Sequence, residues 1–364
     1  MPEPLPLQQI DRTYVRFGKR KLSYFAGCDY FRLASHPLVL KAVGDGLKKF
    51  GLNVAASRLT TGHHAIYDTL EQEIAAFFAS ETAVLISSGY MTNLVAAQAL
   101  KGTFSHVLID EKAHPSLADA STFLDCPILK LQHRSPEDLR RITQRLGKGI
   151  RPILLTDGMF SHDGGIAPLQ AYQKILSRDS WMLVDDAHGA GTLGATGKGS
   201  VELEGVQRRQ LIQTITLSKA FGVYGGAIVC DRQVREQIFS NSRMFVGNTP
   251  LPLPLANAAL HSVKLLRREK GLRRRLVENV KLLKAEAARL GFPLNDSPSP
   301  IFPVIPKDAA HADRLRARLL ANGVFPSFIK YPGGPQDGYF RFVIASEHSR
   351  AQILALARSL APAT

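Results

Sequence analysis

Helical patterns and short hydrophobic runs alternate along most of the chain. Apolar residues recur at helical spacing over residues 36–50 and 67–78. Short apolar runs bounded by Gly, Asp or Ser, which are typical of buried strands, occupy residues 83–87, 106–110, 153–156, 181–185, 212–217 and 227–230. Because such alternation builds a sheet with helices on both faces, residues 31–245 are predicted to form an α/β fold with a mostly parallel central sheet.

The two ends of the chain follow different patterns. Residues 1–30 are expected to form an irregular or extended arm that ends in a short strand over 22–26. A Pro-rich stretch precedes a helix that begins near Pro254. The rest is expected to be a small α+β domain with a helix, a strand over 299–305, a helix over 310–322, a strand over 339–344 and a helix over 350–360.

These patterns predict three regions in the 364 residues, namely an N-terminal arm (1–30), a large domain (31–262) and a small C-terminal domain (263–364). The length agrees with this division, since single cores stop growing at roughly 250–300 residues.

The composition, with 45% hydrophobic and 21% charged residues, is that of an ordinary globular protein. No apolar run approaches the roughly 20 residues that span a bilayer, and residues 1–12 do not resemble a signal peptide. Cys28, Cys126 and Cys230 are scattered and odd in number, so we expect neither a disulfide framework nor a metal site. A reduced, cytoplasmic compartment is expected.

The formal net charge is +15, which is compatible with nucleic acid, an anionic membrane surface, or an anionic substrate or carrier protein as partner. Much of the excess lies in 264–275, where no aromatic residues are interleaved as a base-stacking surface would need. This favours a solvated helix face, with no nucleic-acid or membrane partner expected.

The first candidate for chemistry is the segment WMLVDDAHGAG at 181–191. Ligands of open α/β sheets lie beyond the carboxyl ends of strands. There, the carboxylate of Asp185 can pair with a protonated pyridine nitrogen, and His188 can reach a phenolic oxygen of the same ligand. The alternative is an acid that caps the next turn and a surface histidine.

The second candidate is TITLSKAFGVYGG at 214–226. A lysine that follows a buried strand is costly unless it is paired or used chemically, and desolvation makes its neutral amine a nucleophile for a Schiff base. Lys219 occupies this position, and Thr216 and Ser218 offer hydroxyls to a nearby phosphate. The alternative is a solvated lysine in a turn.

Three further positions add to this set. Ser88, Gly89 and Tyr90 stand between a strand and a helix, where backbone N–H groups bind anions such as phosphate. His114 offers a flat imidazole that can stack on a cofactor ring, although a surface histidine before a proline is equally compatible. Ser161 lies in a loop beyond the 153–156 strand, on the same edge of the predicted sheet.

The order of these motifs resembles the fold-type I enzymes that use pyridoxal 5'-phosphate (PLP), and among them the α-oxoamine synthases. Four segments carry the resemblance: 57–71 (SRLTTGHHAIYDTLE), 156–169 (TDGMFSHDGGIAPL), 184–199 (VDDAHGAGTLGATGKG) and 216–226 (TLSKAFGVYGG). It extends from about residue 24 to the C-terminal end. The pair TG at 61–62 and the stretch SHDGGIAPL favour the oxononanoate synthase branch over the aminolevulinate and sphingolipid branches.

The resemblance implies roles for individual residues. Lys219 is similar to the lysine that bonds PLP, Asp185 to the partner of the pyridine nitrogen, and His188 to the contact of the ring oxygen. The other implied cofactor contacts are His114 (stacking), Ser161, Thr216, the turn at Gly89 and Tyr90, and Thr249, which family members donate to the phosphate across a dimer interface. Arg341 aligns with the arginine that grips the amino-acid carboxylate, a task suited to a bidentate guanidinium.

The resemblance also implies an activity and an assembly. The family condenses an amino acid, here most similar to the branch that uses L-alanine, with an acyl thioester such as pimeloyl-CoA or pimeloyl-ACP, and releases carbon dioxide and an α-amino ketone. A homodimer is expected, and no metal. The alternatives are another α-oxoamine synthase, such as one that joins glycine to acetyl-CoA, a fold-type I aminotransferase, or a basic binding protein that has lost the chemistry.

Three departures from the family pattern concern substrate recognition. Cys28 replaces the first residue of the usual Asn-Asp-Tyr. The N-terminal helix of the family, with its arginine for the acyl substrate, has no counterpart, and Arg12 and Arg16 are the candidates to replace that arginine. The loop at 330–339 lacks the threonine that is frequent before Arg341.

Overall fold

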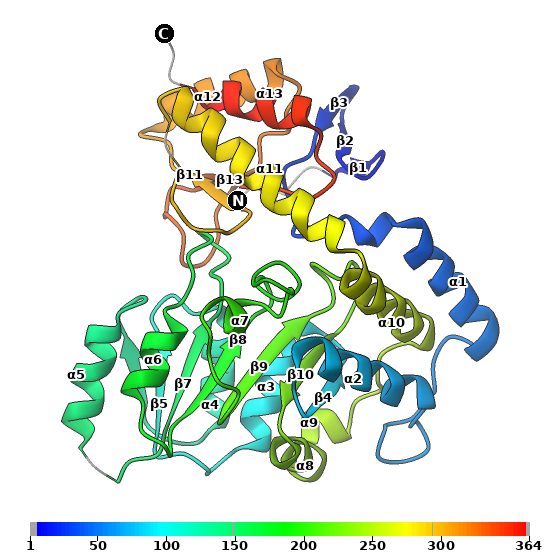
Figure 1. The fold of residues 1–364 in the computed structure, drawn as a ribbon, viewed down its shortest axis with the longest axis vertical. Helices are drawn as coiled ribbons and strands as arrows, with labels where there is room; N and C mark the ends of the chain where they lie inside the picture. The colour runs from blue at the N-terminus through cyan, green and yellow to red at the C-terminus, as the bar shows by residue number, and fades with distance from the viewer. Residues whose placement is uncertain (1–5, 148, 293, 362–364) are drawn as a thin grey trace. The chain divides into compact units, whose positions relative to one another are not determined.

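A computed structural model describes residues 6–147, 149–292 and 294–361, so residues 1–5 of the expected arm lie outside the described residues. Contacts divide the chain into two compact units (Figure 1). The larger holds residues 36–161 and 165–269, and the smaller holds the residues up to Ser35, 162–164 and those from Lys270 onward. Residues 6–35 therefore group with the C-terminal segment, and the unit boundary near the C-terminal side falls between Glu269 and Lys270.

The larger unit contains a seven-stranded sheet in the order β4-β10-β9-β8-β7-β5-β6. Its strands are β4 (Thr82–Ile86), β5 (His106–Asp110), β6 (Ile128–Leu131), β7 (Pro152–Asp157), β8 (Trp181–Asp185), β9 (Leu211–Thr216) and β10 (Gly226–Cys230). β10 is antiparallel to both of its neighbours, and the other pairs are parallel. The predicted α/β fold with a mostly parallel sheet is confirmed, and β6 is a strand that the hydrophobic pattern did not predict.

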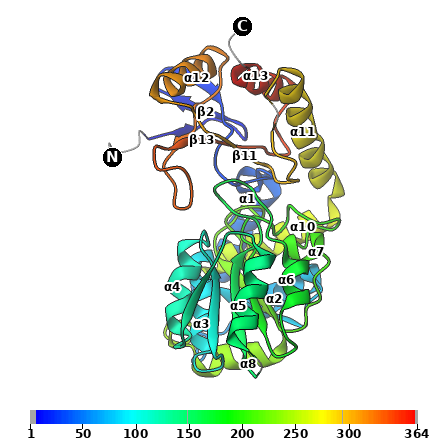
Figure 2. The same cartoon turned by 90° about the vertical axis from the view of Figure 1, so that its left-hand side faces the viewer.

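Helices cover both faces of this sheet (Figure 2). The helices of the larger unit are α1 (Pro37–Phe50), α2 (Ala65–Phe78), α3 (Gly89–Ala99), α4 (Pro115–Phe123), α5 (Pro136–Leu146), α6 (Leu169–Ile175), α7 (Ser200–Leu203), α8 (Arg232–Asn241), α9 (Arg243–Val246) and α10 (Leu253–Arg268). α10 begins next to Pro254, as predicted, and packs against α1 and α2.

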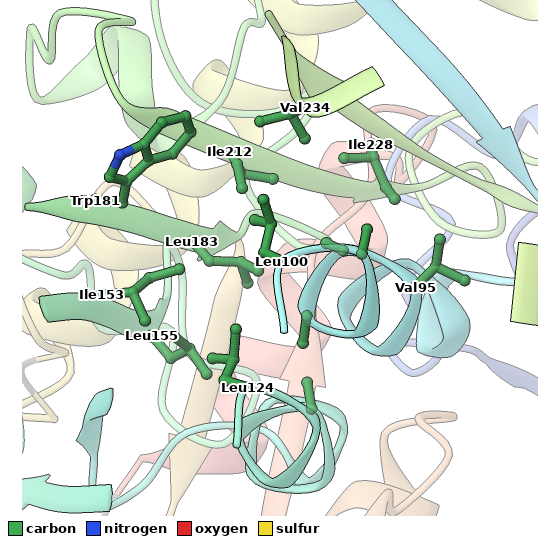
Figure 3. Packing of buried hydrophobic residues seen from close by; sticks show 14 of the residues in the cluster. Val95, Leu100, Leu124, Ile153, Leu155, Trp181, Leu183, Ile212, Ile228 and Val234 are labelled. Carbon is green, nitrogen blue, oxygen red and sulfur yellow. The ribbon is translucent and has the colours of Figure 1, made fainter. Parts of the chain in front are cut away.

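Two hydrophobic clusters hold the layers together, one on each face of the sheet. Alternate residues of β7 enter them, because side chains of a strand point to opposite faces: Ile153 and Leu155 join the first cluster and Leu154 the second. In the first cluster, Val95 of α3 and Val234 of α8 pack toward the sheet (Figure 3). Burial on both faces explains why these strands appear in the sequence as continuous apolar runs.

Charged side chains cover the open edge of β4. The Leu85 N–H donates to Glu71 Oε1 at 2.8 Å, and Arg235 Nη1 donates to the Ala83 carbonyl at 2.9 Å. Glu71 is itself paired with Arg58 and Arg235. These contacts satisfy backbone groups that an uncovered edge would offer to another chain.

The smaller unit contains two three-stranded sheets, β1-β2-β3 and β11-β13-β12. Its elements are β1 (Gln8–Gln9), β2 (Tyr14–Phe17), β3 (Arg20–Ser23), the short 3-10 helix η1 (Leu33–Ser35), α11 (Lys270–Arg289), β11 (Ile301–Val304), α12 (Ala309–Ala321), β12 (Phe328–Ile329), β13 (Tyr339–Val343) and α13 (Arg350–Leu360). The helices and strands expected between 299 and 360 are present, and β12 was not predicted.

The N-terminal segment differs from the expected irregular arm. It folds into the antiparallel sheet β1-β2-β3, and the strand expected over 22–26 is β3 at Arg20–Ser23. Gly18, whose φ is +58°, allows the tight turn between β2 and β3, a conformation that Gly adopts without steric cost. No helix in the described part of the chain is both long and apolar enough to cross a membrane.

His348 fixes the end of β13 in the smaller unit. Its Nδ1 accepts the Ala345 N–H at 2.9 Å, its Nε2 donates to the Tyr24 carbonyl at 3.0 Å, and its ring packs on Phe25 at 4.1 Å. Burial lowers the pKa of His348 to about 3, and the charge of Arg32 acts in the same direction. The imidazole is therefore neutral in the folded protein.

We predict that His348 makes the protein acid-sensitive. Since the pKa of His348 is lower in the folded state than in the unfolded state, its stability contribution is complete above pH ~6.5 and is lost as the pH falls toward 3, a change of up to roughly 5 kcal/mol. Thermal unfolding of the wild type and of His348→Gln should be followed from pH 8 to pH 4. The variant should lose less stability over this range, and parallel curves for the two proteins would contradict the prediction.

Candidate active site

The carboxyl ends of the parallel strands meet at one edge of the sheet. β7 ends in Asp157 and β8 in Asp185, and these two residues are direct neighbours in the register of the pair. Asp185 is also opposite Thr214 of β9, which ends two residues later in Thr216. The sheet thus brings the predicted Asp185 and Thr216 to the same edge, as expected for a ligand site of an α/β fold.

The carboxylate of Asp185 is buried and held by several donors. Its Oδ1 accepts the Ala187 N–H at 3.0 Å. Its Oδ2 accepts Asn93 Nδ2 at 2.7 Å, and Ser116 Oγ lies 3.4 Å from the same oxygen. These contacts fix the position of the carboxyl group at the end of β8.

His114 caps the N-terminus of α4 beside this carboxylate. Its backbone N–H donates to Asp157 Oδ2 at 2.8 Å, and its Nδ1 accepts the Ser116 N–H at 3.2 Å. Burial lowers the pKa of His114; Asp185 opposes this shift and Lys219 adds to it. Asp185, Lys219 and His114 therefore lie within electrostatic reach of one another, which brings three predicted site residues together.

Lys219 lies in the loop between β9 and β10 and is half-buried. The loop is closed by the Leu217 N–H, which donates to the Gly225 carbonyl at 2.9 Å, and by the Gly222 N–H, which donates to the Lys219 carbonyl at 2.9 Å. Because β10 returns antiparallel beside β9, this loop stays at the carboxyl edge of the sheet. The lysine is thus held by backbone contacts next to the buried acids.

The N-terminus of α3 lies directly against β9. Ser88 caps the helix, with its hydroxyl accepting the Met91 N–H at 3.4 Å. A Cβ at Gly89 would lie 2.7 Å from Thr216 Oγ1, so only Gly fits this contact. The Tyr90 side chain is exposed and its hydroxyl donates to Asp119, so its backbone N–H is the group that faces an anion here.

The segment after β8 carries His188, which is buried and whose carbonyl accepts the Thr192 hydroxyl at 2.8 Å. Asp186 anchors this segment, since its Oδ2 accepts the Ser200 N–H at 2.9 Å and Gln213 Nε2 at 2.7 Å. Burial raises the pKa of Asp186 to about 7, although the bonds from Ser200 and Gln213 oppose the shift.

The remaining predicted cofactor contacts have different surroundings. Ser161 is buried beyond β7, whereas Ser218 is exposed and its N–H donates to Thr216 Oγ1 at 3.2 Å. Thr249 is exposed, and its neighbour Asn248 donates to the Ser87 hydroxyl at 2.8 Å. The loop that carries Thr249 is thereby tied to the start of α3.

The smaller unit carries the two predicted substrate residues. Arg341 lies on β13, with its guanidinium 5.0 Å from the centre of the Tyr331 ring. Burial raises the pKa of Tyr30 well above its usual value; Cys28 adds to this shift and Arg341 opposes it. Cys28 and Arg341 therefore both lie near Tyr30.

Four buried polar residues of the site were missed in the sequence: Asn93, Ser116, Asp157 and Thr214. Asn93 occupies a helix position where an apolar residue would be expected, and Asp157 ends a strand in the same way as Asp185. These two features of the sequence could have identified Asn93 and Asp157 as site residues. Burial raises the pKa of Asp157 well above its usual value, and the adjacent Asp185 adds to the shift.

Comparisons with known proteins agree with this geometry. The model of the family "Aminotransferase class I and II" matches residues 29–360. The chain is 37% identical to 8-amino-7-oxononanoate synthase from Thioalkalivibrio sulfidiphilus over 94% of this chain and 88% of that protein.

Solved structures give the same result. A structure of SPT with PLP internal aldimine has a TM-score of 0.90 and 27% identity and covers 97% of this chain and 90% of that one. The 8-amino-7-oxononanoate synthase from Francisella tularensis has a TM-score of 0.79 and 26% identity, with 93% and 96% covered. The chain therefore belongs to the class I and II aminotransferase family of fold-type I, PLP-dependent enzymes, on its α-oxoamine synthase branch.

Proposed function

We propose that this protein catalyses the decarboxylative condensation of L-alanine with a pimeloyl thioester, on CoA or on an acyl carrier protein, to give 8-amino-7-oxononanoate. The reaction is that of the relatives named 8-amino-7-oxononanoate synthase. The observation that carries the proposal is the joint effect of Asp185 and Lys219 on His114 at the carboxyl edge of the sheet. A carboxylate, an amine and a flat imidazole are the groups that PLP requires.

The described residues fit PLP. The cradle at Gly89 has no room for a Cβ and leaves the N–H groups at the start of α3 available for a phosphate. Ser88, Thr216, Ser218 and Ser161 add hydroxyls, and Asp185 supplies the anion for a protonated ring nitrogen. When bound, PLP supplies an electron sink for the carbanion formed at the amino-acid α-carbon.

The side chains of this protein perform the remaining tasks. Lys219 would hold the cofactor through Nζ and, as a free amine, would take the α-proton from the amino acid. Asp185 would pair with the protonated ring nitrogen, and His188 would contact the ring oxygen. His114 would stack on the ring as a neutral imidazole, since burial lowers its pKa.

Substrate binding is assigned to the smaller unit. Arg341 holds the carboxylate of the amino acid with its planar guanidinium, which the Tyr331 ring keeps in position. Cys28 occupies the place of the amide usual in the family, so another α-oxoamine synthase reaction, such as the condensation of glycine with acetyl-CoA, is the second candidate. We further propose a cytoplasmic homodimer in which Thr249 contacts the phosphate bound by the other subunit.

The test is a spectrum of the purified protein with PLP, followed by additions of L-alanine, glycine or L-serine with and without pimeloyl-CoA. The proposal expects a visible cofactor band that L-alanine perturbs and CoA release that requires both substrates. In a parallel series with acetyl-CoA, a response to glycine and acetyl-CoA alone would select the second candidate. A folded protein without a cofactor band would overturn both.

We predict that Lys219→Ala abolishes turnover, by at least about 10³-fold, because no other group at this position can both bond the cofactor and move the α-proton. PLP should remain bound only non-covalently, so that borohydride treatment attaches it to the wild type and not to the variant. The control is Lys174→Ala, which removes an exposed lysine of α6. Near-normal turnover of the Lys219 variant would refute the assignment.

We predict that Arg341→Ala raises the KM for the amino acid by about tenfold or more, since a charged hydrogen bond contributes roughly 1.5–3 kcal/mol. The KM for the acyl thioester should change less than threefold. Arg314→Ala, which removes an exposed arginine of α12, is the matched control. An unchanged amino-acid KM in steady-state kinetics would exclude the proposed role of Arg341.

A further inference from the structure

A continuous line of buried polar side chains connects β9 to His114. The Thr214 hydroxyl donates to Asn93 Oδ1 at 2.7 Å. Asn93 Nδ2 then donates to Asp185 Oδ2 at 2.7 Å and to Ser116 Oγ at 2.9 Å. Ser116 Oγ lies 2.8 Å from His114 Nδ1. Asn93 and Thr214 are fully buried and Ser116 is 1% exposed, so these bonds are shielded from water.

The first contact fixes the orientation of the Asn93 amide. A hydroxyl has one hydrogen, and that of Thr214 points to Asn93 Oδ1 at 2.7 Å, since its other acceptor, the Val184 carbonyl, is 3.4 Å away. With Oδ1 on this side, the NH2 group must face Asp185. The NH2 group then donates one hydrogen to Asp185 Oδ2 and the other to Ser116 Oγ.

The last contact fixes the proton on His114. Nδ1 already accepts the Ser116 backbone N–H at 3.2 Å, so it carries no hydrogen of its own. Ser116 Oγ accepts a hydrogen from Asn93, and its own single hydrogen is donated to Nδ1 at 2.8 Å rather than to Asp185 Oδ2 at 3.4 Å. The neutral ring therefore has its hydrogen on Nε2.

We propose that Asn93 and Ser116 are positioning residues that together hold the Asp185 carboxyl group in place and set the tautomer of His114. Asn93 donates to Asp185 and to Ser116, and Ser116 in turn donates to the His114 ring. The inference rests on the proposed function for its effect on catalysis, whereas the tautomer is a property of the protein without cofactor. Neither residue is assigned a contact with substrate or PLP.

Other charged and aromatic groups also lie near the side chains of Asp185 and His114. Asp157 of β7 lies beside Asp185 and accepts the His114 N–H. Lys219, from the loop after β9, and Asp119 of α4 act on His114 electrostatically, and the Tyr90 ring of α3 lies 6.0 Å from its ring. All of them remain in the variants below, so a change seen there reports on the line of hydrogen bonds.

The first test uses the cofactor-free protein with 15N-labelled histidine, in which His114 is assigned by its loss in His114→Gln. The wild type should show a bare Nδ1 and a protonated Nε2. Ser116→Ala should shift His114 toward a mixture of tautomers, because it removes the shorter contact to Nδ1, at 2.8 Å, and leaves only the longer one from the backbone N–H, at 3.2 Å. Ser121→Ala should not change the ring. Ser121 is a suitable control because it is buried on the same helix and donates only to the Ala118 carbonyl. A protonated Nδ1 in the wild type, or an unchanged ring in Ser116→Ala, would overturn the proposal.

The second test uses the PLP-loaded enzyme and the pH profile of kcat. Asn93→Ala should lower kcat by about 10- to 100-fold, because a misdirected catalytic group costs this much, with the KM for L-alanine within threefold. The acid limb should move to higher pH by about one unit, the equivalent of one charge-assisted hydrogen bond. Asn257→Ala is the control, since Asn257 Nδ2 donates to the Ala42 carbonyl elsewhere in the same unit.

Thr214→Val keeps the volume of the side chain and removes only the hydroxyl. If Asn93→Ala does not fold, this variant tests whether the hydrogen bonds through Asn93 affect the pH profile. It should move the acid limb in the same direction by a smaller amount, and Thr214→Ser should restore it. Unchanged profiles in both Asn93→Ala and Thr214→Val would refute the inference. If instead the wild type binds no PLP, the proposed function fails, and the histidine spectra of the cofactor-free protein still decide on Asn93 and Ser116.

Discussion

The burial of two neighbouring carboxyl groups, Asp157 and Asp185, is the constraint on which the site depends. Parallel strands place them side by side at the carboxyl edge of the sheet. Their surroundings differ. Asp185 accepts hydrogen bonds from Asn93 and from the backbone of Ala187, which fix the position of its carboxyl group. Burial and the charge of Asp185 raise the pKa of Asp157, which therefore favours its neutral form.

The antiparallel strand β10 has a direct consequence for the chemistry. Its pairing with β9 brings the loop that carries Lys219 back over the same edge, and its pairing with β4 brings in Gly89 at the start of α3. The contact between Gly89 and Thr216 leaves no room for a side chain. The lysine, the turn at Gly89 and the acids therefore share one framework of backbone hydrogen bonds, which holds them in fixed positions.

The smaller unit carries much of the positive charge of the protein. Residues 270–364 contain fifteen Lys and Arg against seven Asp and Glu, so much of the net charge of +15 lies in this segment. An anionic acyl carrier or CoA would be attracted by such a surface. Arg341, Tyr331, Tyr30 and Cys28 form the polar cluster of this unit, and the exchange of the usual family amide for Cys28 falls on this cluster rather than on the cofactor residues.

The sequence by itself determined the fold class, the strand at 181–185 and the helix at 350–360 to the residue, and a candidate set that includes Lys219, Asp185 and His114. It did so because buried parallel strands leave continuous apolar runs and because these residue types are costly at strand ends without a use. Only the tertiary structure revealed the sheet formed by the first residues, the unit that they join, and the line from Thr214 through Asn93 and Ser116 to His114. Those features depend on contacts between segments far apart in the chain, and a buried Asn or Ser acquires its role only from the partners that folding places beside it.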